Sequence, residues 1–220
     1  MKLFLDSGDW RLFSKYEIEG YTTNPSLLRD AGTTQYQDTL RWLVSCAKGK
    51  PISLEVVADE FHEMGAEARN LSQYGDNVHV KIPITNTRGE SSSELIRKLS
   101  LEGIKLNITA VMTFEQIRLA ARSLFPKTPS IISIFAGRIA DTGRDPIPFF
   151  TLGLAVKHDK TELLWASARE IYNVKQAEGV ADIITLSPAL LNKMKLFGKD
   201  LAGYSLETVR TFYEDGKSLR

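Results

Sequence analysis

A lysine inside an expected β-strand is the residue of this sequence with the clearest chemical potential. Residues 77–82 (NVHVKI) form a short β-branched run, and strand alternation places Lys81 and His79 on the same side of it. One interpretation is an edge-strand lysine whose amine reaches water. The other is a lysine enclosed by a closed sheet, where desolvation favours the neutral amine. A neutral amine attacks carbonyl carbons to form a Schiff base, so this second interpretation predicts covalent catalysis.

Schiff-base chemistry needs a general acid or base near the lysine, and three residues of other expected strands meet that need. Asp6 and Glu55 are carboxylates, which can divide the proton transfers between them if their environments differ. Thr109 adds a hydroxyl. Structural alternatives remain open at this point. Asp6 could cap a helix over 8–15, Glu55 could lie solvated in a loop, and the hydroxyl could cap the fifth helix.

Two arginines and a serine form a second group of candidates. Arg138, Ser167 and Arg169 follow the expected sixth and seventh strands. The planar guanidinium matches phosphate oxygens, and a serine hydroxyl adds a donor. These residues therefore predict a phosphate site, although ion pairs with nearby helix carboxylates such as Asp141 would equally explain the arginines.

The elements that must position these side chains alternate regularly along the chain. Short β-branched runs alternate with longer amphipathic runs whose apolar residues recur at helical spacing. The expected strands span 2–6, 17–22, 52–56, 77–82, 104–109, 129–134, 162–166 and 181–185. The expected helices span 34–47, 59–74, 91–101, 113–124, 169–178 and 187–196, with an extra C-terminal helix at 205–216.

Eight strand–helix units in a row predict a parallel sheet, and we expect one (β/α)8 TIM barrel domain over residues 1–220. The competing fold is an open doubly wound sheet, but no Gly-x-Gly-x-x-Gly fingerprint follows the first strand. Seven of the eight expected strands also end with polar side chains. Active sites of this barrel lie at that end, so we expect these side chains to converge on its mouth.

Composition excludes several other classes of protein. The chain carries 28 Lys and Arg against 27 Asp and Glu, so its net charge of +1 gives no reason to expect nucleic acid or anionic membrane as a partner. Cys46 is the single cysteine, which fits a reducing compartment. The apolar run at the N-terminus stops at Asp6, too early for a signal peptide, and no run is long enough to span a membrane. We therefore expect a cytoplasmic protein.

Five segments resemble blocks of the transaldolase family, in the order that the family has them. Each block alone is a weak signal, but the five stand in order, and the match runs from Asp6 to Arg169, which is most of the chain. The segments are 22–27 (TTNPSL), 80–83 (VKIP), 106–109 (LNIT), 133–138 (SIFAGR) and 166–169 (ASAR).

The resemblance implies reversible transfer of a dihydroxyacetone unit between sugar phosphates, without a metal or organic cofactor. Lys81 would form the Schiff base, and Glu55 would act through a water molecule held by Thr109. Asp6 would take the proton from the substrate hydroxyl as the carbon–carbon bond breaks. The remaining residues of the matching blocks would bind substrate: Thr23, Asn24, Asn107, Ser133 and Phe135 its carbon chain and hydroxyls, and Arg138, Ser167 and Arg169 its phosphate.

Two positions bear on the subtype that the resemblance implies. The chain is as short as the fructose-6-phosphate aldolases of this superfamily, which tend to have Gln and Tyr where this chain has Glu55 and Phe135. Glu can carry protons whereas Gln can only hydrogen-bond, so these residues favour a transaldolase over an aldolase. A catalytically silent sugar-phosphate-binding barrel is the remaining alternative. Small members of the family form pentamers and decamers, so a homo-oligomer joined by segment 205–216 is expected.

Overall fold

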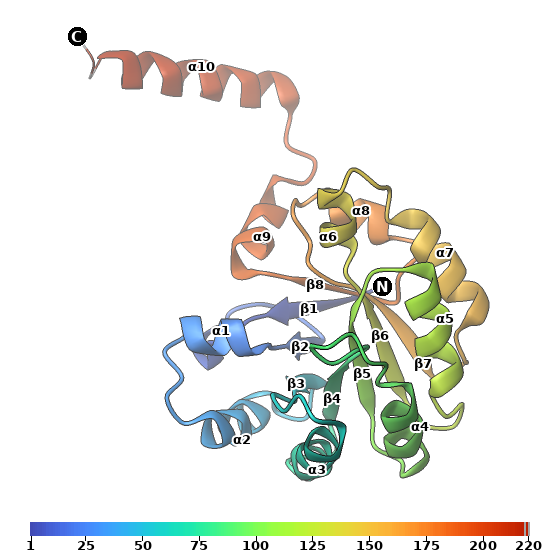
Figure 1. Ribbon diagram of the computed structural model, residues 1–220. Helices are drawn as coiled ribbons and strands as arrows, with labels where there is room; N and C mark the ends of the chain where they lie inside the picture. The colour runs from blue at the N-terminus through green and yellow to red at the C-terminus, as the bar shows by residue number, and fades with distance from the viewer. Residues whose placement is uncertain (218, 220) are drawn as a thin grey trace.

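The chain forms a closed barrel of parallel strands that alternate with helices (Figure 1). This computed structural model describes residues 1–217 and 219. The strands follow one another around the barrel in chain order, as the (β/α)8 prediction requires, and that prediction is confirmed. They are β1 (Lys2–Asp6), β2 (Gly20–Thr22), β3 (Ile52–Glu55), β4 (Val78–Pro83), β5 (Leu106–Val111), β6 (Ser130–Ile134), β7 (Thr161–Trp165) and β8 (Ile183–Leu186).

Helices surround the barrel and begin where the sequence supplies start signals. Pro25 and Pro188 each occupy the first helical position, where the missing N–H costs nothing. Thr113 and Gln116 form a capping box. The α-helices are α1 (Pro25–Asp30), α2 (Tyr36–Cys46), α3 (Phe61–Ser72), α4 (Ser93–Leu101), α5 (Phe114–Ser123), α6 (Ala136–Asp141), α7 (Ile147–Val156), α8 (Asn173–Ala177), α9 (Pro188–Lys193) and α10 (Leu201–Lys217).

Several helices differ from the sequence prediction. The short helices α1 and α6 and the longer α7 are not among the predicted ranges, α8 begins at Asn173 rather than at residue 169, and α10 begins at Leu201 rather than at residue 205. The sequence of α7, IPFFTLGLAV, is apolar almost throughout, so it lacks the polar face that marks a surface helix. The helix considered over 8–15 is only the short 3₁₀ segment η1 (Trp10–Leu12), and Asp9 caps it.

Buried apolar side chains form two layers, one inside the barrel and one between strands and helices. The inner cluster contains Phe4, Ile131, Leu164, Ala166 and Ile183. Phe4 fills the inner layer so closely that a Cβ on Gly20 would lie 2.4 Å from its ring. Apolar side chains fill the lower barrel, and the cavity at the centre of the described barrel lies above them, at the carboxyl ends of the strands.

Strand register brings the candidate residues side by side at that end. Glu55 on β3 pairs with Lys81 on β4, and Lys81 pairs in turn with Asn107 on β5. On the first two strands, Asp6 on β1 pairs with Thr22 on β2. The three adjacent strands β3, β4 and β5 therefore present a carboxylate, an amine and an amide at one level.

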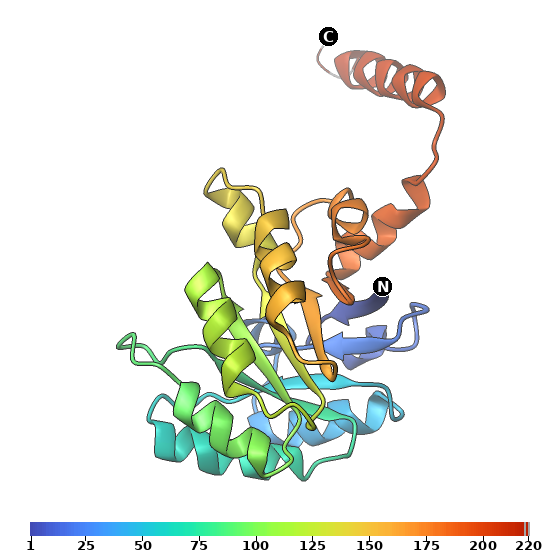
Figure 2. The same cartoon turned by 90° about the vertical axis from the view of Figure 1, so that its right-hand side faces the viewer.

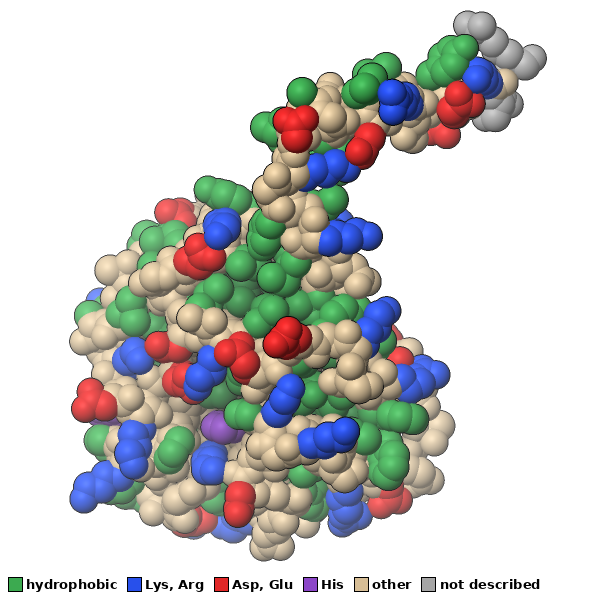
Figure 3. Space-filling model, turned by 180° about the vertical axis from the view of Figure 1, so that it is seen from behind, with side chains coloured by type: hydrophobic (Ala, Val, Ile, Leu, Met, Phe, Trp, Pro, Cys, Tyr) green, Lys and Arg blue, Asp and Glu red, His purple; other side chains and the backbone are tan. Residues whose placement is uncertain are grey.

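The last helix, α10, extends away from the barrel on the segment that follows α9 (Figures 1 and 2). None of its residues is buried. Hydrophobic and charged side chains alternate along it in the space-filling view (Figure 3). Within residues 1–217 and 219, no helix is both long and apolar enough to cross a membrane.

Candidate active site

Lys81 lies inside the barrel and forms an ion pair with Glu55. The Nζ–Oε2 distance is 2.7 Å, and Lys81 is only 6% exposed. Nζ also donates a hydrogen bond to the backbone oxygen of Thr23, at 2.8 Å. These two acceptors fix the position of the amine, and the carboxylate can receive a proton from it. The interpretation of Lys81 as an edge-strand lysine is wrong, because the barrel is closed and has no edge.

Asp6 lies nearby with a different environment from Glu55. Its Oδ1 accepts a hydrogen bond of 2.6 Å from the Thr22 hydroxyl, which lies 2.6 Å from the hydroxyl of Thr185. Burial raises the pKa of Asp6 above its usual value, and the hydrogen bond from Thr22 and the charge of Lys81 act in the opposite direction. Asp6 caps no helix. A partly buried carboxyl with a raised pKa is suited to accept and return a proton during catalysis.

A row of buried polar side chains crosses the barrel at the level of Lys81. The Ser133 hydroxyl donates to Asn107 Oδ1 at 2.7 Å, and Asn107 Nδ2 donates to the Ser53 hydroxyl at 3.0 Å. All three side chains are buried. This chain of hydrogen bonds fixes the amide orientation of Asn107 beside the lysine.

A bulge in β5 aims Thr109 at the cavity. The pairing of β5 with β6 shifts register between Ile108 and Val111, and Ala110 has a positive φ of 60°. Bulges re-aim side chains, and they are common next to active sites. The buried Thr109 hydroxyl lines the cavity and has no hydrogen-bond partner among the described residues. It does not cap α5, which is capped by Thr113.

These side chains surround a cavity of about 110 Å³ at the barrel mouth. We call it the mouth cavity. Eight of the residues predicted from the sequence line it directly, and Glu55, Thr23 and Asn107 contact lining residues from behind or beside them. Asn24 lines it while its Oδ1 caps α1. The lining residues are Asp6, Thr22, Asn24, Lys81, Thr109, Ser133, Phe135, Arg138, Leu164, Ala166, Ser167 and Thr185.

Thr22 and Thr185 are lining residues that the sequence prediction left out of the site. Thr22 belongs to the recognised segment 22–27, and Thr185 ends the eighth expected strand. Polar residues at strand ends were the signal for the other candidates. Applied to the eighth strand, the same signal selects Thr185.

The three residues predicted to bind phosphate lie around Gly137 but line two different cavities. Arg138 and Ser167 line the mouth cavity, with the Arg138 guanidinium 5.1 Å from the centre of the Phe135 ring. Ser167 has a positive φ of 63°, and its carbonyl comes so close to Gly137 that a Cβ there would lie 1.6 Å away. Arg169 instead binds Asp141, with Nη2–Oδ2 at 2.5 Å, and it lines a different cavity outside the mouth.

Trp165 packs away from the mouth cavity. Its ring stacks on Phe150 of α7 with 4.8 Å between centroids, and it is 1% exposed. The bulky residue therefore fills the layer between β7 and α7.

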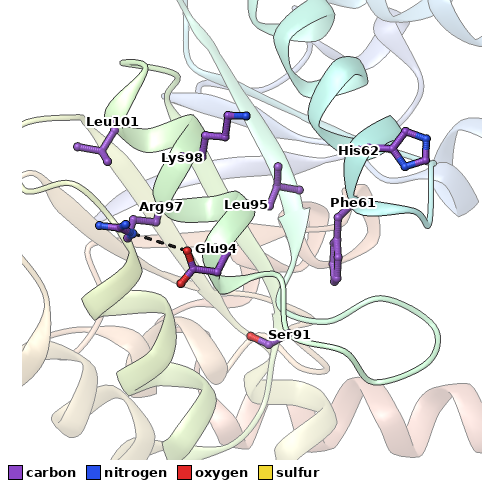
Figure 4. Close-up of a pocket in the computed structure, with 8 residues that line it drawn as sticks. All are labelled: Phe61, His62, Ser91, Glu94, Leu95, Arg97, Lys98 and Leu101. Carbon is purple, nitrogen blue, oxygen red and sulfur yellow. Dashed lines mark ion pairs between the residues drawn. The ribbon is translucent and has the colours of Figure 1, made fainter.

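A larger groove of about 550 Å³ lies outside the barrel, between α3 and α4 (Figure 4). Phe61 and Leu95 line its apolar side, and Glu94 pairs with Arg97 at its edge. Its titratable side chains are exposed on the surface. Among the described residues, no group of three His, Cys, Asp or Glu side chains could hold a metal ion. The mouth cavity is thus where buried charged groups converge.

Comparison with known proteins places this site in a family. A family model described as Transaldolase/Fructose-6-phosphate aldolase matches residues 3–219. A protein of Nitrosopumilus maritimus named "Probable transaldolase" is 36% identical over 204 residues, which cover 88% of this chain and 87% of that protein. A protein of the same name from Mesorhizobium japonicum is 33% identical and covers 96% of this chain and 98% of its own length. The chain belongs to the transaldolase/fructose-6-phosphate aldolase family, which confirms the resemblance identified from the sequence.

More distant solved structures share the barrel. KGPDC from Streptococcus mutans superposes with a TM-score of 0.58 at 10% identity, covering 87% of this chain and 89% of its own. Tryptophan synthase from M. tuberculosis gives a TM-score of 0.55 at 13% identity, covering 88% of this chain and 84% of its own. At these identities the likeness concerns the fold alone.

Proposed function

We propose that this protein is a transaldolase that transfers a dihydroxyacetone unit between sugar phosphates through a Schiff base on Lys81. The observation that carries this proposal is the buried Lys81–Glu55 pair of 2.7 Å, at the cavity that Asp6 also lines. A lysine enclosed with a proton acceptor can lose its proton and attack a ketone. Family membership supports the same chemistry.

The steps follow from the positions of the three groups. Lys81 Nζ adds to the carbonyl carbon of a ketose phosphate, and loss of water from the adduct leaves an iminium. Glu55 moves the protons of this step through a water molecule that Thr109 binds. Asp6 takes the proton of the hydroxyl next to the breaking carbon–carbon bond, and the released electron pair is held in the enamine on the lysine. Addition of the enamine to an acceptor aldehyde reverses these steps.

The other lining residues would hold the substrate in place. Asn24, Asn107 and Ser133 offer hydrogen bonds to its hydroxyls, with Thr23 and Phe135 shaping the cavity. Arg138 and Ser167 would bind the phosphate. Arg169 can join them only after its ion pair with Asp141 breaks.

Glu55 and Phe135 favour transfer over cleavage. Glu55 contacts the Lys81 amine directly and can carry protons to and from it. A Gln at this position, as the aldolases tend to have, could only form hydrogen bonds. The donors would be fructose 6-phosphate or sedoheptulose 7-phosphate. The acceptors would be erythrose 4-phosphate or glyceraldehyde 3-phosphate.

Turnover of fructose 6-phosphate with and without erythrose 4-phosphate tests this assignment. Coupled detection of glyceraldehyde 3-phosphate should show product only when the acceptor is present. Equal product without the acceptor would identify an aldolase that releases free dihydroxyacetone. No product in either assay would support a barrel that binds sugar phosphates without catalysis.

A homo-oligomer, a pentamer or decamer, belongs to the same proposal. One face of α10 carries Leu201, Leu206, Val209, Phe212 and Tyr213, and each of these side chains is at least half exposed. Exposed apolar stripes of this kind indicate a binding surface. A second copy of this chain is the partner that family membership suggests.

A further inference from the structure

The ion pair between Arg169 and Asp141 joins the two loops that carry the proposed phosphate ligands. Arg169 follows β7, and Asp141 is the last residue of α6. Arg169 donates through Nε at 3.2 Å and through Nη2 at 2.5 Å to the two carboxylate oxygens of Asp141. A guanidinium binds phosphate through the same paired geometry. Asp141 therefore occupies the donors that Arg169 would offer to a substrate phosphate.

The stem of the Arg169 side chain lies close to Arg138, which lines the mouth cavity. A Cβ on Gly137, the neighbour of Arg138 in the chain, would lie 3.1 Å from Arg169 Cγ. Gly137 and Asp141 are four residues apart on α6 and so lie on one face of the helix. Arg169 runs along this face, and its guanidinium ends at Asp141. Rotation of the outer bonds alone would turn the guanidinium from Asp141 towards Arg138.

The backbone that carries Arg169 is held by contacts other than this ion pair. Asn173 Oδ1 accepts hydrogen bonds from the backbone N–H groups of Arg169 and Glu170, at 2.8 and 3.1 Å. Asn173 is buried, and its Nδ2 donates to Gln176 Oε1 at 2.7 Å. The loop can therefore keep its shape when the Arg169 side chain changes its partner.

The Arg169–Asp141 pair is exposed enough to exchange partners. Both side chains are 51% exposed. Solvent-exposed ion pairs are weak, and they change an equilibrium constant by about fivefold at most. A substrate phosphate carries more charge than one carboxylate, and it would also bind Arg138 and Ser167. Phosphate can therefore displace Asp141 from Arg169.

We propose that Asp141 is a positioning residue, which holds Arg169 away from the mouth cavity and competes with the substrate phosphate for its guanidinium. This inference rests on the proposed function for the identity of the ligand, and it keeps Arg138, Ser167 and Arg169 as the phosphate ligands. During transfer, the phosphate of the departing aldose must leave before the acceptor phosphate binds, while the three-carbon unit remains on Lys81. A carboxylate that rebinds Arg169 weakens each phosphate complex and so favours this exchange.

Binding of inorganic phosphate tests the competition without relying on turnover. Titration calorimetry should show Kd falling about two- to fivefold in Asp141→Asn, because Arg169 is released from an exposed ion pair. Glu170→Gln is the matched control. Glu170 lines the same outer cavity as Arg169 and Asp141, but within residues 1–217 and 219 its carboxylate forms no ion pair with Arg169. Its replacement should change Kd by less than about twofold.

A double-mutant cycle shows whether the effect of Asp141 passes through Arg169. Arg169→Ala should raise the Kd of phosphate about fivefold, because charge-assisted hydrogen bonds are lost. In the Arg169→Ala protein, Asp141→Asn should change Kd by less than about twofold, since no guanidinium remains to be released. The inference is overturned if Asp141→Asn leaves the wild-type Kd unchanged or raises it. It is also overturned if Glu170→Gln, or Asp141→Asn in the Arg169→Ala protein, lowers Kd as much.

Kinetics of fructose 6-phosphate then connect the competition to the reaction. Asp141→Asn should lower KM about two- to fivefold and should not raise kcat, because the phosphate is a group that does not react. Turnover with a KM that Asp141→Asn leaves unchanged would reject the inference and keep the proposed function. The predicted phosphate-binding cycle in a protein that shows no turnover would sustain the competition and reject the proposed function.

Discussion

The barrel mouth and helix α10 place side chains in opposite ways. At the mouth, polar groups such as Lys81, Asn107 and Thr109 are buried, and on α10 apolar groups such as Phe212 are exposed. Both placements are unfavourable for an isolated chain, because buried polar groups lose hydration and exposed apolar groups order water. We therefore propose a binding partner for each region, which is a substrate for the mouth and a second copy of the chain for α10.

The largest expected effect is the loss of turnover when Lys81 at the barrel mouth is replaced. Lys81→Met removes the amine while keeping an unbranched side chain that packs in the same space. Turnover should fall on the order of 10⁴-fold or more, as when a covalent catalyst is lost. Far-ultraviolet circular dichroism should remain that of the wild type. Retained turnover in a folded Lys81→Met protein would refute the covalent role.

Asp6→Asn should have opposite effects on stability and on catalysis, raising the free energy of unfolding at neutral pH and lowering kcat. Because burial raises the pKa of Asp6 in the folded protein, stability from its neutral form is present at low pH and is lost as pH rises through that pKa. Asn cannot ionise, so Asp6→Asn should be the more stable protein at neutral pH. The difference should shrink as pH falls towards the ordinary value of 3.8.

The same substitution should lower kcat by about 10²-fold or more, since a general base is removed. Urea unfolding at several pH values and a kcat–pH profile measure the two effects. In the wild type, kcat should fall on the acidic side at a pH above 3.8, the ordinary pKa of an aspartate, because the pKa of Asp6 is raised. A variant that is less stable than the wild type at neutral pH would contradict the burial of an ionised Asp6.

A change on α10 should act on assembly and leave the chemistry in place. Phe212→Glu puts a charge on the apolar face, whereas Thr211→Glu puts the same charge on the polar side of the helix. Analytical ultracentrifugation should show a wild-type oligomer that dissociates in Phe212→Glu towards the 24.6 kDa chain and persists in Thr211→Glu. A wild type that sediments as a monomer at every concentration would remove the proposed role of α10.

The smallest expected effect concerns the backbone that aims Thr109. Ala110 holds a positive φ of 60°, which Gly adopts freely and which a β-branched side chain resists. Ala110→Val should lower the free energy of unfolding by about 1–3 kcal/mol, and Ala110→Gly should change it by less than about 1 kcal/mol. Equal denaturation midpoints for the two variants would mean that the bulge adapts without strain.

Strand residues show how far the sequence determines the site. Alternating strand and helix patterns predict a closed parallel sheet with the strands in chain order. In such a sheet, period-two alternation places Lys81 inside the barrel and near Glu55. β-Branched runs bounded by helical patterns mark the strands well. The polar residues that interrupt those runs mark the mouth, and together with the resembling segments they predicted most of the residues that line the mouth cavity. Thr22 and Thr185 also lie in expected strands but were left out of the predicted site.

The remaining differences depend on contacts that no local pattern encodes. Helix α7 buries Phe149, Phe150 and Gly153 and exposes Leu154 and Ala155, so its sequence is apolar on both faces and has no helical period. Arg169 pairs with Asp141, 28 positions away, as the ion-pair alternative for the arginines allowed. The sequence could not choose between that pair and a phosphate, because Asp141 ends α6, a helix that the sequence prediction missed.

Borohydride reduction in the presence of fructose 6-phosphate tests the central claim most directly. Reduction converts the Schiff base into a stable amine, so mass spectrometry of the digested protein should find one dihydroxyacetone-derived adduct, on the peptide that contains Lys81. The Lys81→Met protein treated in the same way should gain no mass. An unmodified wild type, or an adduct on a different lysine, would contradict the account.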